Sequence, residues 1–137
     1  MSRTILVTGG AGYIGSHVLR QLGEAGRDVV TLDNLSKGFR EAVLYGDLVV
    51  GDTANVELVS SVLRDYKVQS ILHFAAHTIV PESISDPLKY YGNNTVATRN
   101  LLSCAKAANV EHFIFSSTAA VYGMPDSAIA DESTPTV

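Results

Sequence analysis

The chain has 137 residues, of which 46% are hydrophobic and 18% charged, and its formal net charge is −4. One globular domain fits this length, and the composition is far from that of a disordered protein. A mildly acidic chain without a basic run argues against a nucleic-acid partner or a membrane surface, and no apolar run is long enough to span a bilayer. Because the first residues lack a signal-peptide pattern, we expect a cytoplasmic protein.

Strand-like and helix-like segments alternate along the chain. The first, residues 4–8, is a β-rich run of contiguous apolar side chains, as in a strand buried on both faces. In chain order, the sequence predicts strands at 4–8, 28–33, 47–51, 70–75 and 112–117. It predicts helices at 12–25, 55–66 and 87–108, and a loop with a short helical turn at 34–46. The residues expected to face inward are Ile14, Val18, Leu19 and Leu22 in the first helix and Val56, Val59, Val62 and Leu63 in the second.

The ends of these helices carry local signals. Gly26 is a stop for the first helix, and Thr53 is a candidate cap for the second. The third has Asp86 as its expected N-cap and Pro87 at its first position. The alternation predicts an α/β fold, a Rossmann-type doubly wound parallel sheet in strand order 3-2-1-4-5 with helices on both faces. Such sheets bind ligands beyond the carboxyl ends of the strands, where the order reverses between strands 1 and 4.

A glycine-rich turn follows the first strand, with the spacing Gly-x-x-Gly-x-x-Gly at Gly9, Gly12 and Gly15. Gly9 permits the tight turn, Gly12 lets the backbone approach a pyrophosphate, and Gly15 lets the helix pack closely on the sheet. Backbone N–H groups around Tyr13 and Ile14, at the helix start, would point at the anion. The turn therefore predicts a nucleotide site, with a purely structural turn as the alternative.

Asp33 stands at the end of the second predicted strand. A carboxylate there accepts hydrogen bonds from the ribose of adenosine and repels the 2′-phosphate that distinguishes NADP. The turn and Asp33 together predict NAD as the cofactor. The other titratable residues predict no metal site, because His17 and His112 are scattered; His73 is expected to be a hydrogen-bonded core residue. The single cysteine, Cys104, excludes an internal disulfide and is expected on a buried helix face.

The sequence carries four motif blocks, at residues 8–16, 33–38, 73–76 and 116–123. Together they resemble the extended short-chain dehydrogenase/reductase family, and within it the UDP-glucose 4-epimerases, over essentially the whole chain. In the related 4,6-dehydratases the last block carries an acidic pair after its threonine, where this chain has Ala119 and Ala120. Because alanine cannot exchange protons, the sequence favours an epimerase over a dehydratase.

The resemblance implies roles in binding NAD and a UDP-sugar substrate. The pyrophosphate would be lined by Gly9, Gly12, Tyr13, Ile14 and Gly15. The adenosine would be held or bordered by Asp33, Asn34, Ser36, Gly38, Asp52 and Thr53. The remainder of the cofactor would meet Phe74, Ala75, Ala76, Asn93, Ser116 and Ser117. Thr118 would act in catalysis by offering its hydroxyl to the sugar oxygen that exchanges a proton. Some family members carry a lysine where this chain has Thr78, and His77 could compensate.

The resemblance also implies a missing part. Members of the family oxidise the sugar transiently at C4 with a tyrosine that has a lysine four residues later, and no tyrosine of this chain has one. We therefore expect residues 1–137 to be the NAD-binding Rossmann domain of a truncated epimerase, without the substrate domain. Such a chain would not interconvert UDP-glucose and UDP-galactose by itself. A non-catalytic NAD-sensing module is the alternative.

Two features predict self-association. The helix at 87–108 corresponds to one of the pair through which the family forms homodimers, although Leu101 and Leu102 could simply pack on the sheet. The fifth strand, with Phe113, Ile114 and Phe115, is expected to be an exposed sheet edge, which invites pairing with another chain.

Overall fold

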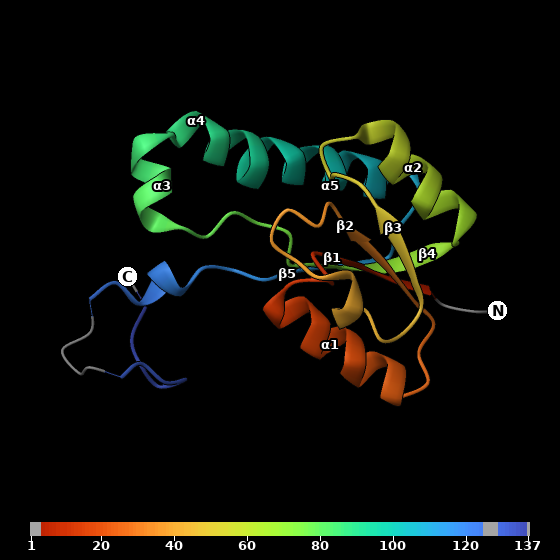
Figure 1. Ribbon diagram of the computed structural model, residues 1–137, viewed down its shortest axis with the longest axis horizontal. Coiled ribbons are helices and arrows are strands. Elements are labelled where there is room, and N and C mark those ends of the chain that lie inside the picture. The colour runs from red at the N-terminus through yellow and green to blue at the C-terminus, as the bar shows by residue number, and fades with distance from the viewer. Residues whose placement is uncertain (1–3, 125–128, 137) are drawn as a thin grey trace.

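One parallel sheet forms the centre of the computed structural model, which describes residues 4–124 and 129–136 (Figure 1). The strands are β1 (Thr4–Thr8), β2 (Val29–Asp33), β3 (Asp47–Val50), β4 (Val68–His73) and β5 (His112–Phe115). Their order is β3-β2-β1-β4-β5, and every pairing is parallel. The predicted α/β class, Rossmann-type sheet and strand order are confirmed.

Helices cover both faces of this sheet. They are α1 (Tyr13–Glu24), α2 (Val56–Asp65), α3 (Val80–Ser85), α4 (Pro87–Tyr90) and α5 (Ala97–Ala107), with 3-10 turns at Arg40–Ala42 and Ala119–Tyr122 and a π-helical segment at Tyr91–Val96. In Figure 1, α1 lies on one face of the sheet, and α2 and α5 lie on the other. The apolar residues of β1 are contiguous for this reason: Leu6 packs in the cluster with α2 and α5, and Val7 packs in the cluster with α1.

Two predicted details of the helices are wrong. The cap of α2 is Asn55, whose Oδ1 accepts a hydrogen bond from the backbone N of Leu58 at 3.0 Å, and not Thr53. Ile14 and Val56 do not face inward, since they are 56% and 46% exposed. Both belong to the first turn of their helix, ahead of the turns that pack on the sheet.

The third predicted helix contains a π-helical segment between two α-helical ones. Asp86 caps it as predicted, with Oδ1 accepting from the backbone N of Lys89 at 3.2 Å, and Pro87 is its first residue. The backbone then continues through α4, the π-helical segment and α5. The preceding helix α3 was not predicted, because its six residues are too few to show a helical period.

Both β4 and β5 end earlier than predicted. β4 stops at His73, so Phe74 and Ala75 belong to the loop that follows it, and β5 stops at Phe115. Within residues 4–124 and 129–136, β5 pairs with β4 alone, and Ile114 and Phe115 are 58% and 56% exposed. The expected apolar edge is therefore present. None of the helices in these two ranges is long and apolar enough to cross a membrane.

Candidate functional site

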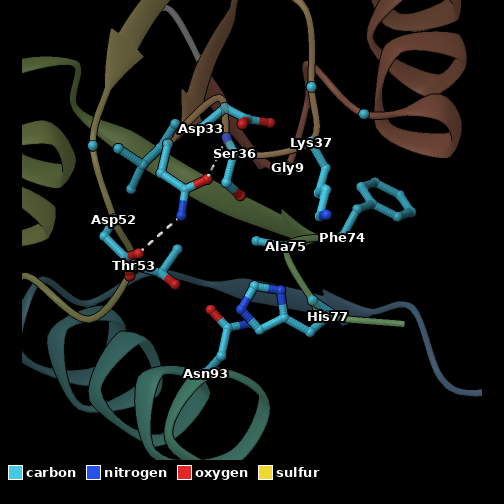
Figure 2. A pocket seen from close by; sticks show the side chains of 16 residues that line it. Gly9, Asp33, Ser36, Lys37, Asp52, Thr53, Phe74, Ala75, His77 and Asn93 are labelled. Atoms are coloured by element: carbon cyan, nitrogen blue, oxygen red, sulfur yellow. Dashed lines mark hydrogen bonds between the residues drawn. The ribbon is translucent and has the colours of Figure 1, made fainter. Parts of the chain in front are cut away.

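A cleft lies at the carboxyl ends of β1, β2, β3 and β4, around the point where the strand order reverses (Figure 2). Its volume, counting the open mouth, is about 570 Å³. It is lined by the following residues that were predicted to bind the cofactor: Gly9, Gly12, Asp33, Asn34, Ser36, Gly38, Asp52, Thr53, Phe74, Ala75, Ala76 and Asn93. The topology thus gathers segments that are far apart in the sequence at the predicted crevice.

The remaining predicted site residues do not line the cleft. They are Tyr13, Ile14, Gly15, Ser116, Ser117 and Thr118. The first three begin α1 beyond Gly12, and the side chains of Tyr13 and Ile14 are exposed. The last three follow β5, which lies one strand further from the switch point. The hydroxyl of Thr118 accepts a hydrogen bond from the backbone N of Ala120 at 3.1 Å and so begins a 3-10 turn.

The glycine-rich turn forms one wall of the cleft and leaves no space for side chains. Gly9 adopts a left-handed φ of +72°, and a Cβ on it would lie 2.6 Å from the backbone N of Ala75. A Cβ on Gly15 would overlap the carbonyl oxygen of Gly9. Glycine is therefore required at both positions, as the sequence predicted.

Helix α1 begins at this turn without a side-chain cap. Gly12 is the N-cap residue and provides no side-chain cap for the backbone N–H groups that follow it. An uncapped helix start presents these N–H groups and the positive end of the helix dipole to an anion. The glycine-rich turn and the start of α1 therefore fit the pyrophosphate of a dinucleotide.

Asp33 joins the end of β2 to the glycine-rich turn. Its Oδ2 accepts a hydrogen bond from the backbone N of Ala11 at 3.0 Å, and its Oδ1 accepts one from the backbone N of Leu35 at 2.8 Å. Leu35 has a left-handed φ of +57°, so the second bond holds an unfavourable backbone conformation. Each carboxylate oxygen keeps a further lone pair, so Asp33 can still accept hydrogen bonds from a ribose.

Asp52 lies at one end of the cleft (Figure 2), and Asn34, which also lines the cleft, is bonded to it. The Nδ2 of Asn34 donates to the Oδ2 of Asp52 at 2.9 Å, which links the ends of β2 and β3. The other side-chain oxygens of the pair accept hydrogen bonds from the backbone N of Ser36 and of Ala54. Both side chains are thereby fixed before any ligand arrives.

The loop after β4 lies next to the glycine-rich turn and is clamped by the π-helical segment. The Oδ1 of Asn94 accepts from the backbone N of His77, and its Nδ2 donates to the backbone O of His77, both at 2.8 Å. The neighbouring Asn93 points toward the cleft in Figure 2. Single π turns within α-helices occur frequently at functional sites. Here the segment that contains the π turn places Asn93 in the cleft and bonds Asn94 to the backbone of His77 in the neighbouring loop.

Sequence reasoning missed four residues that line the cleft: Leu32, Lys37, Gly51 and His77. Lys37 lies inside the motif block 33–38, and treating every member of that block as a candidate would have found it. His77 was considered only as a substitute for a lysine at position 78. Thr78 itself does not line the cleft.

Comparison with known proteins identifies the family. A family model described as the NAD dependent epimerase/dehydratase family matches residues 5–137. The chain belongs to this family. The UDP-glucose 4-epimerase of Azospirillum brasilense is 50% identical over 137 residues, which are 99% of this chain and 39% of that protein.

Solved structures of relatives agree with this assignment. The UDP-glucose 4-epimerase of Brucella ovis in complex with NAD has a TM-score of 0.88 at 38% identity, covering 99% of this chain and 42% of that one. The enzyme of Bifidobacterium longum in complex with NAD+ and UDP has a TM-score of 0.85 at 35% identity, covering 98% and 42%. The chain spans about two fifths of the length of these relatives.

A buried histidine directly precedes the loop that lines the cleft. His73, at the end of β4, is 2% exposed. Its Nδ1 lies 2.6 Å from the Oγ1 of Thr8, and its Nε2 lies 2.8 Å from the Oγ1 of Thr98. Burial lowers the pKa of His73 to about 4. The prediction of a core histidine is confirmed, and Cys104 is likewise buried. No cluster of metal-binding side chains occurs among residues 4–124 and 129–136.

His73 is expected to make the stability of the protein depend on pH. The unfolded imidazole titrates near 6.5 and the folded one near 4, so the unfolded state binds more protons between these values. The contribution of His73 is complete above pH 6.5 and is lost as the pH falls toward 4, by up to about 3 kcal/mol. Urea unfolding at pH 7, 6, 5 and 4.5 measures this loss.

Two variants isolate the histidine responsible. His73→Gln, which cannot titrate, should flatten the fall in unfolding free energy below pH 6.5. His112→Gln removes a histidine whose side chain is 70% exposed, and it should leave the fall unchanged. An equally steep fall in His73→Gln and wild type would show that other groups cause it.

Proposed function

We propose that this chain holds NAD in the cleft above the sheet and is the cofactor-binding portion of a UDP-glucose 4-epimerase. The observation that carries the proposal is the junction between the glycine-rich turn and Asp33. The carboxylate of Asp33, at the end of β2, accepts a hydrogen bond from the backbone N of Ala11 in the turn. A turn open to a pyrophosphate beside a carboxylate placed for a ribose is the arrangement that binds dinucleotides. The NAD complex of the Brucella ovis relative supports it.

The residues would divide the cofactor between them. Backbone groups of the turn, at Gly9, Gly12, Tyr13, Ile14 and Gly15, would bind the pyrophosphate. Asp33 and Asn34, with Ser36 and Gly38 nearby, would hold the adenosine ribose, and Asp52 and Thr53 would hold the adenine. Phe74, Ala75, Ala76 and Asn93 would border the nicotinamide half, with Ser116 and Ser117 further along. The carboxylate of Asp33 would also exclude NADP by repelling its 2′-phosphate.

Bound NAD would supply the hydride acceptor and donor for epimerisation at C4 between UDP-glucose and UDP-galactose. Thr118 would contribute a hydroxyl to the sugar oxygen that exchanges a proton. Its Oγ1 accepts a hydrogen bond from the backbone N of Ala120, which leaves the O–H of Thr118 able to donate to the sugar. A base is also needed, and none of the tyrosines has a lysine four residues later. We therefore propose residues 1–137 as an NAD-binding domain that is inactive by itself.

Partners and location belong to the same proposal. A UDP-sugar is the proposed substrate of the intact enzyme, since the relative from Bifidobacterium longum was solved with UDP. A homodimer, without nucleic acid or membrane, stays a prediction; the exposed Ile114 and Phe115 of β5 favour association between copies. A cytoplasmic location of the protein likewise stays a prediction.

Hydrogen exchange with and without NAD tests the proposal by position. NAD should slow amide exchange in 9–16, in 33–38 and in the loop 74–77, because these segments surround the cleft. The segment 20–27, at the far end of α1, provides the internal control and should be unchanged. Unaltered exchange throughout at millimolar NAD would contradict the proposal. Protection confined to regions outside the cleft would contradict the placement of the cofactor.

A further inference from the structure

The cleft is lined by two carboxylates and one ammonium group, and only the carboxylates have hydrogen-bond partners within the described part of the chain. The charged side chains that line it are Asp33, Lys37 and Asp52. Both carboxylates are engaged: Asp33 accepts from two backbone N–H groups, and Asp52 accepts from Asn34 and from Ala54. Within the described part of the chain, the ammonium of Lys37 forms neither a hydrogen bond nor a salt bridge.

The loop that carries Lys37 is fixed against the glycine-rich turn. The backbone N of Phe39 donates to the backbone O of Ala11 at 3.0 Å. Gly38 lies so close that a Cβ on it would be 2.8 Å from the backbone O of Ala11. In Figure 2 the side chain of Lys37 extends into the cleft on the side of Phe74, away from Asp52. Its ammonium therefore belongs to the end of the cleft formed by the turn.

A competing carboxylate near Lys37 is already satisfied. Hydrogen bonds from Lys89 and Tyr90 lower the pKa of Glu82, and Lys37 adds only the weakest of the attractions that do so. Glu82 holds the Nζ of Lys89 in a salt bridge and accepts from the hydroxyl of Tyr90 at 2.8 Å. Lys37 is therefore not needed to neutralise Glu82 and remains available to a ligand.

We propose that Lys37 is the cation that binds the pyrophosphate of NAD in this chain. Without it the cleft would carry two negative charges, and a pyrophosphate would bring two more. The N–H groups of the turn and the dipole of α1 offset part of that repulsion, and an ammonium at the rim of the turn offsets more. The inference rests on the proposed binding of NAD.

Titrations with ligand fragments, followed by NMR, test this role. Adenosine carries no phosphate, whereas ADP-ribose and NAD carry the pyrophosphate. Lys37→Met should weaken binding of ADP-ribose and NAD about tenfold, because a charge-assisted hydrogen bond is lost. Binding of adenosine should stay as in wild type. Lys37→Arg should keep the affinity within about twofold, since it keeps the charge.

The control variant is Lys106→Met, which removes an exposed lysine from α5, far from the cleft, and should bind NAD as wild type does. The difference in NAD affinity between wild type and Lys37→Met should also shrink as salt rises from 50 to 500 mM, because screening weakens the lost interaction.

Equal NAD affinity in Lys37→Met and wild type would overturn the role of Lys37 but not the proposed function. An equal loss for adenosine would overturn it too, by showing that Lys37 shapes the loop. Absence of NAD binding in wild type would instead overturn the proposed function.

Discussion

Gly15→Ala is expected to weaken NAD binding at least about 100-fold and to lower the free energy of unfolding by about 2 kcal/mol. The added methyl group would overlap the carbonyl oxygen of Gly9 and press on the Cα of Gly10. These are backbone atoms, so the turn itself must shift, and its N–H groups would no longer converge on a pyrophosphate. Titration with NAD and urea unfolding measure the two losses.

Gly92→Ala is the matched control for this change. Gly92 also lies in a helical segment, but a Cβ there would meet nothing within 4 Å. The control should bind NAD normally and should gain up to about 1 kcal/mol of stability from reduced chain entropy. A Gly15→Ala protein that binds NAD as tightly as Gly92→Ala would show that the turn does not hold the cofactor.

Asp33→Asn is the second change with a large expected effect. The carboxylate accepts from Ala11 and from Leu35, but an amide has only one oxygen, so one of the two N–H groups would face an NH2 group. We expect the free energy of unfolding to fall by about 1–3 kcal/mol. NAD should bind about tenfold more weakly, since charge-assisted hydrogen bonds to the ribose are lost. The affinity for NADP should fall less than the affinity for NAD, because the 2′-phosphate of NADP no longer meets a negative charge.

Asp65→Asn controls for the removal of one carboxylate. Asp65 ends α2 at the surface, where its Oδ1 pairs with the Nε of Arg64 at 2.9 Å. Exposed pairs of this kind contribute little, so its stability should stay within about 0.5 kcal/mol of wild type. If Asp33→Asn were no less stable than Asp65→Asn, the two backbone hydrogen bonds would not be holding the turn.

The sequence predicted the parts of this molecule that periodicity and topology determine. Alternating strands and helices predicted a doubly wound parallel sheet, for which 3-2-1-4-5 was the order expected. The rule for ligands in such sheets then located the cleft between β1 and β4. The turn at Gly9 and the carboxylate at Asp33 were found because a backbone constraint and a charge restrict the residue type. Ile14 was assigned inward by its period alone, and it is exposed because it precedes the packed part of α1.

The parts that depend on tertiary contacts were not predictable. The clamp of Asn94 on His77 requires a π turn, which leaves no mark in a pattern of apolar residues. The hydrogen bond from Ala11 to Asp33 joins residues 22 apart and exists only once β1 and β2 pair. The position of Lys37 follows from the packing of its loop on the turn, which no local spacing reveals.

We infer that this chain binds NAD through the glycine-rich turn and Asp33. Calorimetric titration of the purified chain with NAD and, separately, with NADP measures this binding and its selectivity. We predict binding of one NAD per chain and an affinity for NADP at least about tenfold lower, as one repelled charge next to a carboxylate implies. Equal binding of both cofactors would show that Asp33 does not select NAD. No binding of NAD by a chain that circular dichroism shows to be folded would show that the turn and Asp33 do not hold the cofactor.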